Sequence, residues 1–172
     1  MLQLSGALLN KPVLSLRSGN PVAWVVAPLI NPNSLKIEGF YCEDSFDKNQ
    51  LILLYQDIRE LSQQGFIVND HDALSTPEDL VRLKRVIEQH FELMKKPVET
   101  TSKDKVGKVS DYAVETTTMY IQKLYVSQSI LKSLAGGSLS VDRSQIVEIT
   151  NKRIIIQDIL KGTPSPATAS VA

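Results

Sequence analysis

An internal repeat constrains this sequence more than any other feature. Blocks from the first part of the chain return in the same order 84 to 88 positions later. The matched segments are 11–13 with 96–98, 22–25 with 106–109, 35–41 with 119–125, 57–61 with 145–149, and 66–70 with 154–158. The offset grows where the second copy carries the loop-like segment 133–137. Matched blocks in a constant order predict a duplicated domain.

Each copy is expected to form short strands separated by turns. Strands are expected at 22–26, 35–43, 51–55 and 65–68, and near 139–141 and 153–156 in the second copy. Leu35 and Ile37 alternate with polar residues, the pattern of a half-buried strand, and a shift after Gly39 predicts a bulge or bend. Many short strands with close turns favour a small, strongly bent sheet closed as a barrel.

A helix is predicted between the two copies. A hydroxyl residue precedes Pro77 and acidic residues follow it, which is typical of a helix N-terminus. An apolar stripe then recurs at three- and four-residue steps, formed by Leu80, Leu83, Ile87, Phe91 and Met94. We expect a helix from about Pro77 to about Glu92 that joins the copies and packs on one or both of them.

Charge and composition narrow the classes of function. The net charge is zero, which excludes strong non-specific attraction of the whole molecule to nucleic acid or anionic membranes. The charge is uneven, with −3 over residues 1–74 and +4 over residues 95–172. No apolar run approaches the roughly 20 residues that span a bilayer. With no secretory signal pattern and a single cysteine, the sequence predicts a cytoplasmic protein without membrane insertion.

The repeated blocks resemble the PRC-barrel family, the small β-barrel of the photosynthetic reaction-centre H subunit and of RimM-type ribosome maturation factors. The resemblance is carried by the openings at 9–13 and 94–98, the glycine motif at 105–111, and the closing segments 57–68 and 145–156. The first copy departs from the motif, since Ala23 replaces the glycine and Pro28 lies near the expected aspartate. A complete RimM-type factor would carry an additional, different barrel, and the H subunit would carry a membrane-spanning helix. Neither is expected in this sequence.

The resemblance implies a mainly β protein with two tandem small PRC-type β-barrels joined by an α-helix. The first repeat is expected at 5–74, the linker helix at 75–94 and the second repeat at 95–162. A tail at 163–172, rich in proline, serine, threonine and alanine, is predicted to be disordered. The family implies a non-catalytic barrel used for docking, and it supplies no catalytic, cofactor-binding or metal-binding residues.

Cys42 and His71 are the candidate centres of chemistry. Cys42 corresponds to Val126 in the repeat, so a buried packing role is expected rather than that of a nucleophile. His71 lies beside Asp70 and Asp72, a group that would suit a metal or a general base. No second histidine or cysteine stands at ligand spacing, so a solvated turn is expected, with an enzyme or metal protein kept as an alternative.

Three aromatic residues are candidates for contact with a partner protein. Tyr41 and Tyr125 occupy equivalent positions in the repeat, which favours the core or the interface between barrels. Trp24 has no aromatic counterpart, because Lys108 stands at the equivalent position. If exposed, Trp24 is the best single candidate for a partner contact, since tryptophan is enriched at binding hot spots. Burial between barrel and helix is the competing expectation.

The densest basic cluster suggests a second class of function. It consists of Lys95, Lys96, Lys103, Lys105 and Lys108, with Tyr112 and Tyr120 nearby. On one face, these residues would contact phosphates and stack on bases. We therefore expect a non-enzymatic adaptor that docks another protein, or alternatively an RNA- or ribosome-associated factor. A homodimer and, by kinship alone, attachment to photosynthetic membranes are further candidates.

Overall fold

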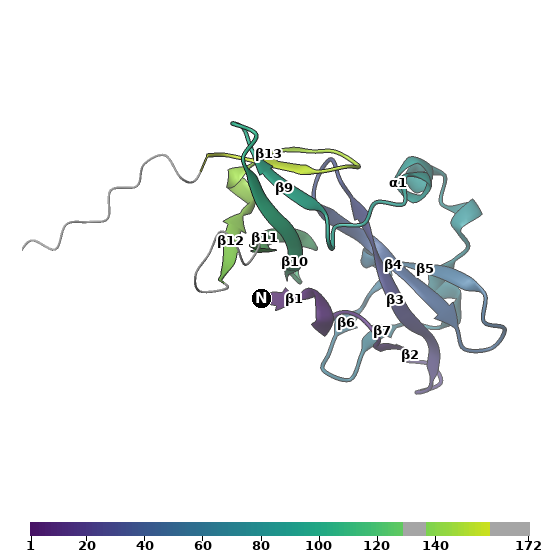
Figure 1. The fold of residues 1–172 in the computed structure, drawn as a ribbon. Coiled ribbons are helices and arrows are strands. Elements are labelled where there is room, and N and C mark those ends of the chain that lie inside the picture. Colours follow the sequence, from purple (N-terminus) through teal and green to yellow (C-terminus); the bar gives the residue numbers. More distant parts are fainter. Residues whose placement is uncertain (129–136, 159–172) are drawn as a thin grey trace, which may run out of the picture.

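A computed structural model describes residues 1–128 and 137–158. The fold is mainly β, with its strands hydrogen-bonded into one curled sheet (Figure 1). Three expectations lie outside the described residues: most of the inserted loop at 133–137, the end of the second repeat at 159–162, and the tail at 163–172.

The strands follow the same order in the two halves of the chain. The first half contains β2 (Pro12–Ser15), β3 (Pro21–Asn31), β4 (Lys36–Asp44), β5 (Gln50–Leu54), β6 (Glu60–Leu61) and β7 (Phe66–Val68). The second half contains β9 (Pro97–Thr100), β10 (Lys105–Glu115), β11 (Tyr120–Ser127), β12 (Ser138–Asp142), β13 (Ile146–Ile149) and β14 (Ile154–Ile156). Single 3-10 turns, η2 (Tyr55–Asp57) and η6 (Arg143–Gln145), follow the fourth strand of each half.

Strand pairing repeats together with strand order. In the first half, β2 pairs antiparallel with β3 and parallel with β7. In the second half, β9 pairs antiparallel with β10 and parallel with β14. The antiparallel series β3–β4–β5 recurs as β10–β11–β12. The repeated sequence blocks therefore correspond to a repeated set of hydrogen-bonded strands.

Backbone irregularities recur at equivalent places. Three pairs of equivalent residues have positive φ angles: Asn10 and Lys95, Gly19 and Lys103, and Leu35 and Met119. The β3–β4 and β10–β11 ladders each carry two register shifts at matching positions. One of them falls between Leu29 and Ile30, where Leu29 pairs with Gly39 and Ile30 with Ile37, so the bulge on β4 lies just before Gly39 rather than after it. A bulge bends its strand, and two per ladder help the sheet to curl.

The two halves are joined by β1 (Leu2–Leu4), which pairs antiparallel with β10, and by a contact where their longest hairpins turn. The amide of Ile37 donates to the carbonyl of Met119 at 2.8 Å, and the amide of Ile121 donates to the carbonyl of Leu35 at 2.9 Å. Ile37 and Ile121 are equivalent in the repeat, as are Leu35 and Met119. The joint is therefore reciprocal, with each half giving and receiving the same backbone hydrogen bond.

A stack of cations and aromatic rings covers this joint. The Lys36 ammonium lies 3.9 Å from the centre of the Tyr55 ring and 5.5 Å from that of Tyr120. The Arg143 guanidinium lies 4.8 Å from the centre of the Tyr120 ring. Tyr55 and Arg143 begin the equivalent turns η2 and η6, and Lys36 and Tyr120 are also equivalent in the repeat. At each of these two positions, one half carries a cation and the other an aromatic ring.

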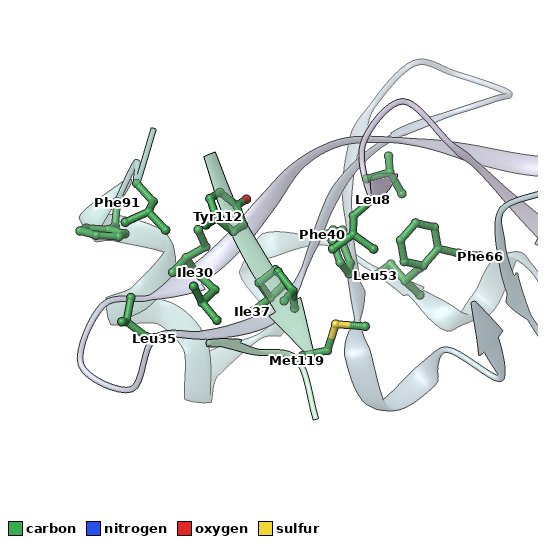
Figure 2. Close-up of a cluster of buried hydrophobic side chains, with 14 of the residues drawn as sticks. Leu8, Ile30, Leu35, Ile37, Phe40, Leu53, Phe66, Phe91, Tyr112 and Met119 are labelled. Carbon is green, nitrogen blue, oxygen red and sulfur yellow. The ribbon is translucent and has the colours of Figure 1, made fainter. Parts of the chain in front are cut away.

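One hydrophobic core runs through both halves. Buried side chains from β3, β4, β5 and β7 form a single cluster with those from β10, β11, β12 and β14. Figure 2 shows Ile37 of the first half beside Tyr112 and Met119 of the second, and Leu35 belongs to the same cluster. Because the core is shared, the two halves are expected to unfold together.

The linker is less helical than the sequence predicts. Instead of one helix from about 77 to about 92, it forms the 3-10 turns η4 (Pro77–Asp79) and η5 (Val81–Leu83) and a short helix, α1 (Lys84–Gln89). Leu80 has a non-helical backbone between the two turns, and His90 ends α1 in the left-handed conformation. The chain beyond His90 is no longer helical, so Leu93 is buried and Met94 is exposed, against the expected stripe. Proline does occupy the first position of η4.

Candidate functional site

The outer face of β3 carries two exposed apolar side chains. Trp24 is 45% exposed and Val26 is 53% exposed, while Val25 between them is buried. The alternation places Trp24 and Val26 on the same face of the strand. Trp24 lies opposite Pro12 of β2 and Glu43 of β4 in the strand registers. Burial of Trp24 between barrel and helix is therefore wrong, and its indole is accessible.

The second half shows that the fold does not require apolar residues here. Lys108 and Ser110 occupy the positions equivalent to Trp24 and Val26, and both are exposed. The Ser110 hydroxyl donates a hydrogen bond to the carbonyl of Tyr125 at 3.1 Å, on the neighbouring strand. The same strand arrangement thus tolerates either apolar or polar side chains at these two positions. The tryptophan and the valine are not explained by folding, which makes their face a candidate docking surface.

The two candidate tyrosines lie at equivalent, half-buried positions. Tyr41 on β4 pairs with Ala27 of β3 and Ile52 of β5, and burial raises the pKa of its phenol. Tyr125 on β11 pairs with Ser140 of β12. Tyr41 is two residues from Glu43 on the same strand, so it faces the same side of β4 as the residue opposite Trp24. Tyr125 belongs to the other half, and its role as a partner contact stays a prediction.

The basic cluster is divided between structural and exposed lysines. Lys96 is half-buried, with its amine donating to the carbonyl of Asn151 at 2.7 Å and lying 4.7 Å from the centre of the Phe91 ring. Burial lowers the pKa of Lys96. These contacts are structural, so Lys96 is poorly placed for nucleic acid. Four lysines of the cluster are exposed on and around the β9–β10 hairpin: Lys95, Lys103, Lys105 and Lys108.

The aromatic residues that were expected to stack on bases are engaged elsewhere. Tyr112 is 2% exposed in the core, and burial raises the pKa of its phenol above the ordinary value. Tyr120 lies in the cation and ring stack at the joint. A hollow of about 420 Å³ beside Tyr55 is bordered by the linker turn at Leu80, and one of about 630 Å³ lies next to Lys105 and Lys108. Neither hollow brings an aromatic stacking platform to the lysines.

A buried carboxylate orients His71, a contact that the sequence analysis missed. Nε2 of His71 lies 2.8 Å from Oδ2 of Asp44, whose side chain is 6% exposed against 41% for the imidazole. Burial raises the pKa of Asp44, but hydrogen bonds from the Phe46 amide and from His71 outweigh it and leave the pKa below its ordinary value. The exposed Phe46 ring meets the imidazole edge-on, with 5.4 Å between ring centres. His71 thus ties the chain after β7 to the end of β4.

The described residues offer little for covalent or metal chemistry near His71. The Ser15 hydroxyl donates to Asp70 at 3.0 Å rather than to the imidazole. Within 1–128 and 137–158, the histidine, cysteine and carboxylate side chains form no group of three that would hold a metal. Cys42 is fully buried, and burial raises its pKa to about 12, as expected of a packing residue. The same ranges contain no helix long and apolar enough to cross a membrane.

Comparison of the sequence with models of known protein families gives no match, and no curated protein matches it either. The candidate surfaces therefore rest on the geometry of this chain.

Proposed function

We propose that this protein is a non-catalytic, cytoplasmic adaptor in which two tandem PRC-type barrels present a docking surface for another protein. The barrel architecture is supported by the repeated pairing of strands and by the matched bulges that curl the sheet. The docking role is supported chiefly by one observation. Trp24 and Val26 are exposed on β3, where the equivalent strand of the same fold carries a lysine and a serine.

Exposed aromatic and aliphatic side chains in one place are typical of a protein–protein contact. Tryptophan supplies a large apolar area with few rotatable bonds, and it is among the residues most often found at binding hot spots. Pro12 and the half-buried Tyr41 lie on the neighbouring strands and extend this surface. We call the four residues Pro12, Trp24, Val26 and Tyr41 the β3 face.

The repeat supplies the variant that tests this role. The double change Trp24→Lys and Val26→Ser gives the β3 face the residues of the second half, which the fold tolerates there. Leu16→Ser, at another exposed apolar residue of the first half, is the matched control. Affinity capture from cell extract should retain a discrete protein with the wild type and with Leu16→Ser, at low and high salt. The same protein should be lost with the double variant. An identical set of captured proteins for all three would refute the proposal.

Four exposed lysines near the β9–β10 hairpin support a second candidate, contact with RNA or the ribosome. Such binding depends on phosphate charges and weakens steeply as salt rises, whereas apolar docking does not. Capture of RNA or ribosomal proteins that is lost at high salt and after Lys103→Gln with Lys108→Gln would favour this candidate over docking through the β3 face.

A further inference from the structure

An exposed carboxylate stands directly beside the indole of the β3 face. Trp24 and Glu43 are paired residues of the antiparallel β3–β4 ladder. Paired residues point to the same side of the sheet, with Cβ atoms about 4.5–5.5 Å apart. Both side chains are exposed. The second half has Lys108 and Ser127 at these positions and lacks both the ring and the carboxylate.

The Glu43 carboxylate is held only loosely within the molecule. Its ion pair is with Lys48, at 3.5 Å, and both side chains are more than half exposed. Exposed pairs of this kind contribute little and exchange readily with other partners. The amine of Lys11, the residue before Pro12 of the β3 face, donates to the carbonyls of Ser62 and Gln63. Glu43 is therefore available to a cation from outside, in competition with Lys48.

A ring face and a carboxylate side by side favour a cationic side chain. A guanidinium or ammonium group stacks on an indole through the ring quadrupole while its N–H groups donate to the carboxylate. Arginine fits better than lysine, because its planar group stacks and donates at once. The first half carries a net charge of −3 over residues 1–74, which adds attraction for a basic segment.

We propose that the partner of the β3 face presents a basic segment, one of whose arginines stacks on Trp24 and pairs with Glu43 in place of Lys48. This inference rests on the proposed docking function and specifies the chemistry of the partner.

Trp24 is the single tryptophan of the chain, so its fluorescence reports directly on this contact. The probe is hepta-arginine, with hepta-glutamate as the control peptide. Hepta-arginine should change the emission in a saturable way, and hepta-glutamate should not. Glu43→Gln should weaken hepta-arginine binding about fivefold, the upper end for an exposed ion pair, and Lys48→Ala should tighten it about twofold.

Glu60→Gln is the matched control, because it removes one exposed negative charge of the same half away from the β3 face. It should leave the affinity unchanged. Equal weakening by Glu43→Gln and Glu60→Gln would mean non-specific attraction and would overturn the inference, as would an equal response to hepta-glutamate. If Glu43→Gln leaves the affinity for hepta-arginine unchanged while Trp24→Lys with Val26→Ser loses the captured partner, the basic-partner inference fails and the docking function stands. If the double variant also keeps the captured partner, both fail.

Discussion

Arg143 is the most heavily used side chain at the joint between the halves. It belongs to η6, and its guanidinium donates to the carbonyls of Ser34, Leu35 and Ile121 while lying on the Tyr120 ring. Arg143→Ala would remove all of these contacts at once. It would leave the reciprocal backbone bonds of the joint in place, so the fold should survive in weakened form.

The size of the loss follows from those contacts. A hydrogen bond to a charged group contributes about 1.5–3 kcal/mol, and a cation on an exposed ring about 0.5–1 kcal/mol. Water can replace part of this, because Arg143 is only half-buried and carbonyls freed at the edge become hydrated. We expect the free energy of unfolding to fall by about 3 kcal/mol. For a protein of this size, that corresponds to a Tm lower by roughly 6–12 °C.

Urea unfolding, followed by Trp24 fluorescence and by far-ultraviolet circular dichroism, measures this change. The two signals should give the same midpoint, because one core spans both halves. Arg153→Ala is the control, since Arg153 forms an ion pair with Glu99 at 3.1 Å and is itself half exposed. That control should lose less than about 1 kcal/mol. An Arg143→Ala variant within about 0.5 kcal/mol of the wild type would refute the account of the joint.

Three further outcomes are expected. Gly107→Ala should destabilise the protein by more than about 2 kcal/mol in urea unfolding, because φ is +157° and the new Cβ would lie 1.9 Å from a β11 carbonyl oxygen. The control Ala23→Gly, at the equivalent position, should lower the free energy of unfolding by only about 0.5–1 kcal/mol. Equal losses for the two variants would contradict the reasoning. The folded-state pKa of Asp44 lies below its unfolded value, so its stabilisation is present above that value and is lost as pH falls through the folded pKa. The stability gap between wild type and Asp44→Asn should therefore shrink in acid, and a gap independent of pH would contradict this. With its pKa raised to about 12, Cys42 should not react with a thiol reagent at neutral pH unless the protein is unfolded.

Features encoded locally were predictable from the sequence. Strands appear where short apolar runs lie between turn residues, and a shift in alternation over a few neighbouring residues indicated a bulge close to its actual place just before Gly39. Matching blocks also revealed the repeat, because equivalent positions keep their apolar or turn character. Such signals depend on nearest neighbours along the chain, which a sequence displays directly.

Contacts between distant segments were not predictable in the same way. Asp44 and His71 are 27 positions apart. The residues next to them in the sequence do not indicate that the Asp44 carboxylate is buried against the His71 ring. The linker carried a strong helical signal, but Leu80 and His90 leave the helical conformation, so tertiary packing decided what propensity alone did not. The charge of Lys96 is visible in the sequence and groups it with the surface lysines, whereas its contact with the Phe91 ring is not visible there.

The reciprocal joint has the form of an interface in a symmetric dimer, where each subunit offers the other the same contact. Two identical subunits meeting in this way must carry every surface twice. Fusing them into one chain removes that constraint, since each copy can then change alone. Here one copy carries Trp24 and Glu43, and the other carries Lys108 and Ser127 at the same places. The molecule thus presents one aromatic, acidic face rather than a matched pair, so a monomer would engage its partner with single valency.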